Sequence, residues 1–157
     1  MFTRRGLNAY RQNSTRTELS VADPYTITKM LFQGAFERLM QARGAIEHGD
    51  LALKGSKLAS ASSIIENLRS TLDFNVNADL AQKLFDMYTY IIDRIADASV
   101  EISIESIDAA LKVLLPLKNA WDQIPLSEQQ KAAAQRNTVQ HDAVSVTGNG
   151  AIAQGAV

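Results

Sequence analysis

The sequence predicts an all-α protein, an antiparallel up-and-down four-helix bundle with a mobile N-terminal arm and a disordered C-terminal tail. Three observations support this fold class. Apolar residues recur every three or four positions in four successive stretches of roughly 20 to 25 residues. Short segments rich in turn-forming residues separate these stretches, and short connections make neighbouring helices antiparallel. No stretch alternates between apolar and polar residues as a strand does.

The 157 residues divide into three predicted segments. Residues 1–22 form an arm rich in Arg, Asn, Ser and Thr, residues 23–125 form the bundle, and residues 126–157 form a low-complexity tail. The composition of the tail predicts disorder, apart from a marginal helix over 127–136.

The first predicted helix covers about residues 24 to 48 and organises the rest of the chain. Asp23 is expected to cap it, Pro24 to take its first position, and Gly49 to end it in a left-handed conformation. Two apolar rows run along it. The main row is Ile27, Leu31, Ala35, Leu39, Ala42 and Ile46, and the second row is Phe32, Phe36 and Met40. A helix packed on one side needs a single row, so this helix is either central or offers a face to a partner.

The second helix is predicted over about 51 to 73, with Asp50 as its cap and Ile64 beside its seam. The seam has heptad spacing and consists of Leu58, Ala61, Ile65, Leu68 and Leu72. The third helix is predicted over about 78 to 102, with Asn77 as its cap. It again has two rows. The main row is Leu80, Leu84, Met87, Ile91, Ile95, Ala98 and Ile102, and the second row is Ala81, Phe85, Tyr88 and Ile92.

The fourth helix is predicted over about 105 to 123, after a break near Ser103. Its apolar positions include Ile107, Leu111, Leu114, Leu117 and Trp121. Pro116 lies inside this helix and removes one backbone hydrogen bond, which predicts a kink.

Composition and charge exclude several classes of function. The net charge of −1 argues against general attraction to nucleic acid or anionic membranes. No stretch is apolar enough to predict membrane insertion, and no apolar run follows Arg4 and Arg5 as in a secretory signal. The chain has no cysteine, which excludes disulfides and thiolate chemistry and is compatible with a reducing cytosol.

Catalytic chemistry is not expected. The two histidines, His48 and His141, each lack the Glu three positions earlier that marks di-metal bundles. They also provide no nucleophile and base pair, and the glycines do not have phosphate-binding spacing. The sequence therefore predicts no enzyme, no cofactor and no metal site. The doubled apolar rows leave two interpretations open: a dimer interface or wide internal packing, and grooves that receive amphipathic helices of a partner.

The order and spacing of several motifs resemble the flagellin export chaperone family, the flagellar secretion chaperones FliS. The resemblance extends from about Leu7 to Trp121. It consists of Tyr10 in the arm, Asp23-Pro24, the block 30–35 (MLFQGA), the turn 45–50 (AIEHGD), Ile64-Ile65, Leu68, Leu72-Asp73, the block 84–90 (LFDMYTY) and the block 117–121 (LKNAW). The chain departs from the family pattern at Phe32, Gln33 and Met87, which puts any polar contact at the first two positions in doubt.

The resemblance implies a small cytoplasmic helical bundle that binds the disordered C-terminal segment of flagellin. Such a chaperone prevents premature polymerisation and interacts with a component of the flagellar export apparatus. The alternative is a non-catalytic regulatory or structural bundle that acts through homodimerisation. Partner-binding residues are expected beside the narrowest core seams, where Ile64 and Leu117 are the candidates most expected to be core. The candidates are Phe32, Phe36, Ile64, Phe85, Tyr88, Ile92, Leu117 and Trp121, with Leu7 and Tyr10 of the arm as a gate over the groove.

Overall fold

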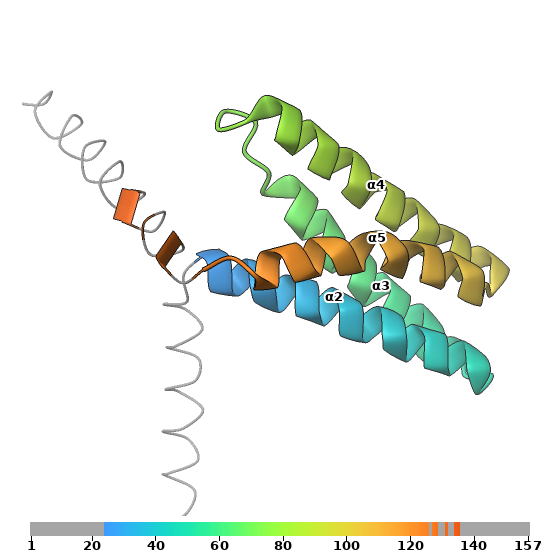
Figure 1. The fold of residues 1–157 in the computed structure, drawn as a ribbon. Helices are drawn as coiled ribbons and strands as arrows, with labels where there is room; N and C mark the ends of the chain where they lie inside the picture. Colours follow the sequence, from blue (N-terminus) through green and yellow to red (C-terminus); the bar gives the residue numbers. More distant parts are fainter. Residues whose placement is uncertain (1–23, 126, 129–130, 132–133, 136–157) are drawn as a thin grey trace, which may run out of the picture. The chain divides into compact units, whose positions relative to one another are not determined.

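The computed structural model describes residues 24–125, 127–128, 131 and 134–135. Within them the chain forms four long helices: α2 (Pro24–Glu47), α3 (Leu51–Ser70), α4 (Ala78–Glu101) and α5 (Ile104–Asp122). One compact unit spans Thr26–Gln123. In Figure 1, α2 and α4 run in one direction and α3 and α5 run back, so the predicted antiparallel four-helix bundle is confirmed.

The turn between α2 and α3 has the form that the sequence predicts. Gly49 has a φ of 73°, and its N–H donates to the carbonyl of Ile46 at 3.1 Å. The N–H of Asp50 donates to the carbonyl of Ala45 at 2.8 Å, which completes a Schellman motif. The Asp50 carboxylate then accepts from the N–H of Leu53 at 3.0 Å and caps α3. These bonds connect the two helices through a tight reversal.

Side-chain caps also begin the next two helices. Asn77 accepts from the N–H of Leu80 at 3.1 Å and caps α4, as predicted. Ser103 accepts from the N–H of Ser106 at 3.2 Å and caps α5. The predicted cap of α2, Asp23, lies outside the described residues. The helix α3 ends at Ser70, slightly before its predicted end.

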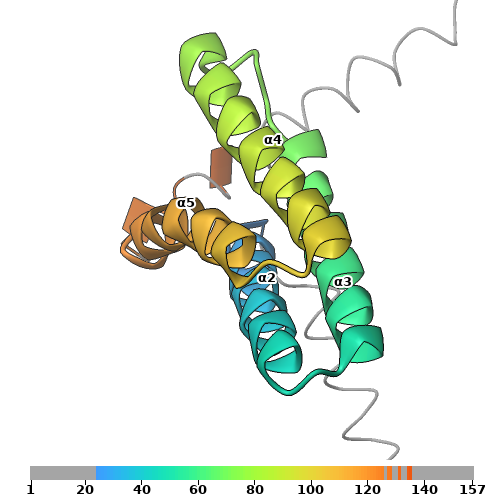
Figure 2. The same cartoon turned by 90° about the vertical axis from the view of Figure 1, so that its right-hand side faces the viewer.

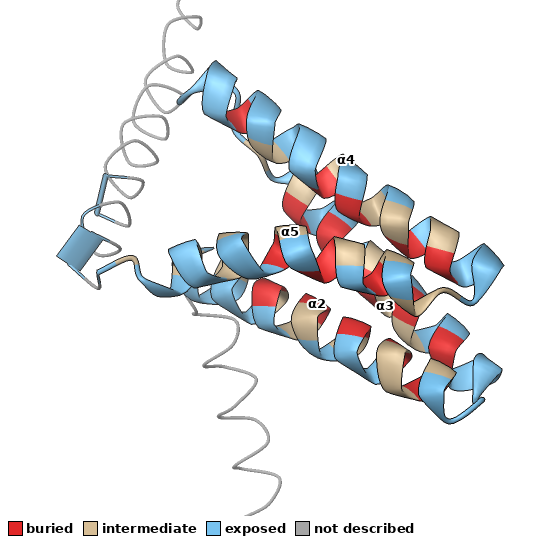
Figure 3. Ribbon diagram, turned by 45° about the vertical axis from the view of Figure 1, so that its right-hand side comes forward, coloured by how far each residue is buried: buried red, intermediate tan, exposed pale blue. Residues whose placement is uncertain are grey.

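The core lies between all four helices, where Figure 3 shows buried residues on their facing sides. The largest fully buried side chains are Leu39, Leu58, Ile65, Ile91, Ile95, Ile107 and Leu114. The predicted seam of α3 is buried from Leu58 to Leu68, and Leu72 packs against it partly exposed. In α2 the middle of the main row is buried, whereas Ile27 is exposed.

The predicted main row of α4 is wrong in the first half of the helix and at its C-cap, where Ile102 is 48% exposed. Leu80 is 53% exposed and Met87 is 40% exposed, so neither belongs to the core. The buried or partly buried residues instead follow heptad spacing on a row between the two predicted rows. This row is Ala81, Leu84, Tyr88, Ile91, Ile95 and Ala98. Which row of α4 is buried depends on the space that α3, α2 and α5 leave for side chains such as Ala81 and Tyr88. The periodicity of α4 alone does not predict that space.

The helix α5 continues through Pro116 to Asp122. A kink at Pro116 remains a prediction. Figure 2, which views the bundle from its side, shows α5 next to α2 and α3 next to α4. The described residues 127–128, 131 and 134–135 are helical, and the remainder of the predicted tail and the whole predicted arm lie outside the described residues.

Candidate partner-binding surface

An aromatic cluster joins α2, α4 and α5. The ring of Phe32 lies 6.4 Å from that of Tyr88 and 6.2 Å from that of Trp121, centroid to centroid, and both pairs are tilted. Phe32 is 2% exposed and Tyr88 is 4% exposed, while Trp121 is partly buried against the core. Burial raises the pKa of the Tyr88 phenol to about 12, because the phenolate would lose its hydration. Two predicted partner-binding residues are thus core residues in the free bundle.

The residues most expected to be core are more accessible than these two. Ile64 and Leu117 are partly buried and pack against the edge of the core. Ile64 approaches α2 where that helix has no side chain, since a Cβ at Gly34 would lie 3.5 Å from Ile64 Cδ1. Both positions thus pack against the core, as expected, while part of each side chain stays accessible.

Exposed apolar side chains gather on the first half of α4 and before it. Phe85 is 36% exposed. Its ring centroid lies 6.4 Å from that of Phe74 in the α3–α4 connection. The guanidinium of Arg69 lies 5.2 Å from the Phe85 ring centroid, a distance typical of a cation–π contact. Arg69 also donates to the hydroxyl of Thr89 at 3.1 Å. Arg69 therefore holds the Phe85 ring against α3, while Leu80 and Met87 of the same helix remain exposed.

A second apolar strip follows the seam between α2 and α5. Phe36 is partly buried, and the Lys118 ammonium lies 6.0 Å from its ring centroid. Lys118 also pairs with Asp122 at 2.8 Å on its own helix. Met40 of α2 and Leu115 of α5 are exposed. Because Lys118 already has a carboxylate partner, this strip offers apolar contacts more than charge.

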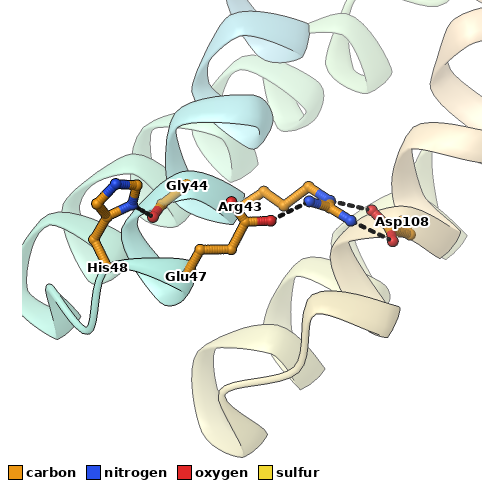
Figure 4. A network of polar contacts seen from close by, with 5 residues as sticks. All are labelled: Arg43, Gly44, Glu47, His48 and Asp108. Atoms are coloured by element: carbon orange, nitrogen blue, oxygen red, sulfur yellow. Dashed lines mark hydrogen bonds and ion pairs between the residues drawn. The ribbon is translucent and has the colours of Figure 1, made fainter.

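One end of this seam is fixed by a polar network, drawn in Figure 4. Arg43 of α2 donates to both carboxylate oxygens of Asp108 in α5, at 2.8 and 3.4 Å, and also to Glu47 one turn along α2. The hydrogen bond from Arg43 to Asp108 is the main cause that raises the pKa of Arg43 above its usual value. His48 lies nearby, with Nδ1 2.7 Å from the carbonyl oxygen of Gly44. The network joins α2 to α5, and its charged side chains, Arg43, Glu47 and Asp108, pair with one another.

Sequence reasoning placed several accessible residues incorrectly or omitted them. Leu80 and Met87 were assigned to the core row of α4, and Met30 and Leu115 were not singled out. The heptad spacing from Ala81 to Ala98 could have indicated the correct row. The remaining candidate, Ile92, packs partly buried against the core. Leu7 and Tyr10 lie outside the described residues.

These features define a class of protein. Among the residues that the structure describes, no group of three or more His, Cys, Asp or Glu could hold a metal ion. In that same part of the chain, no helix is both long and apolar enough to cross a membrane. What the bundle presents is apolar side chains on α4 and along the α2–α5 seam. It is a helical bundle that exposes apolar side chains outside its core.

Comparison with known proteins identifies the family. The family described as flagellar protein FliS matches residues 6–130. The flagellar secretion chaperone FliS of Vibrio cholerae is 35% identical over 132 residues, which cover 84% of this chain and 97% of that protein. FliSB of Pseudomonas aeruginosa is 35% identical, covering 79% of this chain and 98% of that protein. FliS of Salmonella typhimurium is 34% identical, covering 79% and 93%. The chain belongs to the FliS family of flagellar secretion chaperones, a non-catalytic family, and the resemblance found in the sequence is confirmed.

Proposed function

We propose that this chain binds the disordered C-terminal segment of flagellin in the bacterial cytosol and prevents its premature polymerisation. It then assists delivery of the segment to a component of the flagellar export apparatus. The observation that carries this proposal is the exposed apolar side chains of α4, Leu80 and Met87, on a helix that also packs through Tyr88 into the aromatic cluster. Similarity to chaperones named for flagellar secretion supports the choice of client.

The physical reason lies in what such a client exposes. A flagellin end that packs into a filament as helices carries apolar residues at helical spacing, and these must be covered before assembly. A segment that folds on binding can cover a large surface, while the cost of ordering it keeps the affinity moderate. Moderate affinity suits a complex that must later release its client. Exposed methionines such as Met40 and Met87 also adapt to different packing partners because their side chains are unbranched.

Burial ranks the proposed contact residues. Phe36, Ile64, Phe85, Ile92, Leu117 and Trp121 reach the surface at least in part and are proposed to touch the client directly. Phe32 and Tyr88 lie beneath them, so we propose that they contribute by supporting the aromatic cluster.

The test is binding of a purified flagellin C-terminal segment, measured by calorimetry together with the mass of the complex in solution. Phe85→Gln should weaken binding by roughly tenfold, which corresponds to about 1.4 kcal/mol. The neighbouring exposed Asp86 provides a matched control, because Asp86→Ser changes the same helix turn without removing apolar surface. A chain that forms a dimer and ignores the segment would contradict the proposal and favour the homodimer alternative.

We also propose that the arm gates this surface through Leu7 and Tyr10. Burying two apolar side chains contributes a few kcal/mol, which the cost of ordering the arm partly offsets, so a client could displace it. Deleting residues 1–17 should increase binding of the dye ANS and speed or tighten client association. Unchanged dye binding and unchanged client affinity would rule the gate out.

A further inference from the structure

Lys54, in the first turn of α3, is the one buried polar or charged residue of the described bundle, with 5% of its surface exposed. Its ammonium donates to two backbone carbonyl oxygens of α4, that of Ala98 at 3.3 Å and that of Ser99 at 3.2 Å. None of the salt bridges in the described part of the chain involves Lys54. A buried ammonium needs compensation, and here the α4 backbone supplies it.

The acceptors belong to a helix end that lacks the usual closure. The last four carbonyls of a helix have no partner within it, and together they carry partial negative charge. At the ends of α3 and α5, the cap residues Thr71 and Gln123 donate their own N–H groups back into the helix. No such bond from Ile102 is found at the end of α4, and Ile102 has a φ of 53°, which is unfavourable for a β-branched residue. Lys54 of α3 therefore supplies hydrogen-bond donors to carbonyl oxygens at the end of α4.

The opposite half of α4 is held differently. Figure 3 shows α4 diverging from α5 toward its N-terminal end, where most of its surface is exposed. Ala81 and Tyr88 of this half are buried, and Arg69 of α3 adds partly exposed contacts to Thr89 and the Phe85 ring at its surface. The C-terminal end of α4 is thus anchored by polar contacts of a buried charge, whereas the polar and cation–π contacts of its N-terminal half with α3 are partly exposed.

We propose that Lys54 is a positioning residue that clamps the C-terminal end of α4, so that a docking client displaces only the N-terminal half of that helix. The clamp itself is a property of the free chain. The statement about the client rests on the proposed function, and the measurements below separate the two.

The first measurement is hydrogen exchange of the full chain without client. Lys54→Met keeps the apolar stem and removes the ammonium, so amides of residues 98–106 should exchange roughly tenfold faster because local opening becomes easier. Lys57→Met, one turn along α3 and outside the contact, serves as the matched control and should leave these amides unchanged. Equal exchange at 98–106 in wild type and Lys54→Met overturns the clamp.

A second measurement uses the wild-type chain and does not depend on how a variant folds. A buried, hydrogen-bonded ammonium exchanges its protons slowly enough for a nitrogen-correlated NMR signal near neutral pH. Lys54 should give such a signal with contacts to Ala98 and Ser99, whereas Lys57 should not. A Lys54 ammonium that exchanges as fast as that of Lys57 overturns the clamp.

The third measurement adds the flagellin C-terminal segment. In wild type, exchange changes in α4 should be confined to residues 80–90, and in Lys54→Met they should extend to the C-terminal end of the helix. Restoring a basic donor with Lys54→Arg should return the confined pattern, which a general loss of stability would not do. Changes spread along all of α4 in wild type overturn the displacement statement. Absence of any binding contradicts the proposed function and, with it, the displacement statement, while the first two measurements still decide the clamp.

Discussion

The helices α3 and α4 lie side by side in the bundle but expose very different surfaces. α3 buries one seam from Leu58 to Leu68. It exposes Leu51 and Leu53 in its first turn, and beyond that turn its exposed residues are Gly, Ser, Ala, Glu and Asn. α4 buries a longer seam, from Ala81 to Ala98, and still exposes Leu80, Met87 and Tyr90. The bundle needs only the seam. The additional apolar residues of α4 lie outside the core, and for this reason we place the proposed partner surface on α4.

The largest expected effect is on stability through the α3 seam. Ile65 is fully buried, so Ile65→Ala should lower the free energy of unfolding by about 2–5 kcal/mol through lost burial and a residual cavity. Leu80→Ala in α4 removes a similar volume from an exposed site and should cost under about 0.5 kcal/mol. Urea unfolding of both variants checks the comparison. Similar losses for the two would show that α4 is packed as tightly as α3.

The next effect depends on pH and on the aromatic cluster beneath the α4 surface. Tyr88 has its pKa raised from 10.0 to about 12, so its contribution to stability is complete below pH 10. As the pH rises from about 10 to about 12 the unfolded chain loses the phenol proton first, and about 2–3 kcal/mol should be lost. Tyr88→Phe should remove this part of the alkaline destabilisation. If wild type and Tyr88→Phe lose stability in parallel, Tyr88 is hydrated in solution.

A smaller stability effect with a clear binding effect is expected at Met87. Met87→Gln should change the free energy of unfolding by less than about 0.5 kcal/mol because the side chain is already exposed. Binding of a flagellin C-terminal segment should weaken severalfold if Met87 lies in the interface. Thermal melting and calorimetry on the same samples separate these outcomes, with Lys83→Gln as a polar control on α4. Unfolding of Met87→Gln would place this residue in the core after all.

The smallest effect is expected from removing residues 126–157. This segment has almost no apolar periodicity, so truncation should shift the stability of the bundle by no more than about 0.5 kcal/mol. The melting temperature of the truncated chain is the measurement. A large decrease would mean that residues 126–157 also stabilise the bundle.

Much of the fold followed from local signals. Pro24, Gly49, Asp50 and Asn77 act within a few residues of themselves, and the helix ends that they mark were predicted correctly. The α3 seam was predictable because α3 has a single apolar row. The α4 seam was not, since two rows compete there and the choice depends on which row faces the neighbouring helices. Burial of Phe32 and Tyr88 has the same origin, because their ring contacts join residues far apart in the chain.

The tight connections within the bundle have a consequence for how quickly it forms. Antiparallel helices joined by short turns make most contacts between sequence neighbours, and such low contact order is typical of chains that fold in microseconds to milliseconds. The main long-range step is the closure of α5 on α2, where Arg43 meets Asp108 across 65 positions of sequence. Residues up to α5 must therefore leave the ribosome before the bundle can close. We expect the chain to be ready for a client almost as soon as that last helix is synthesised.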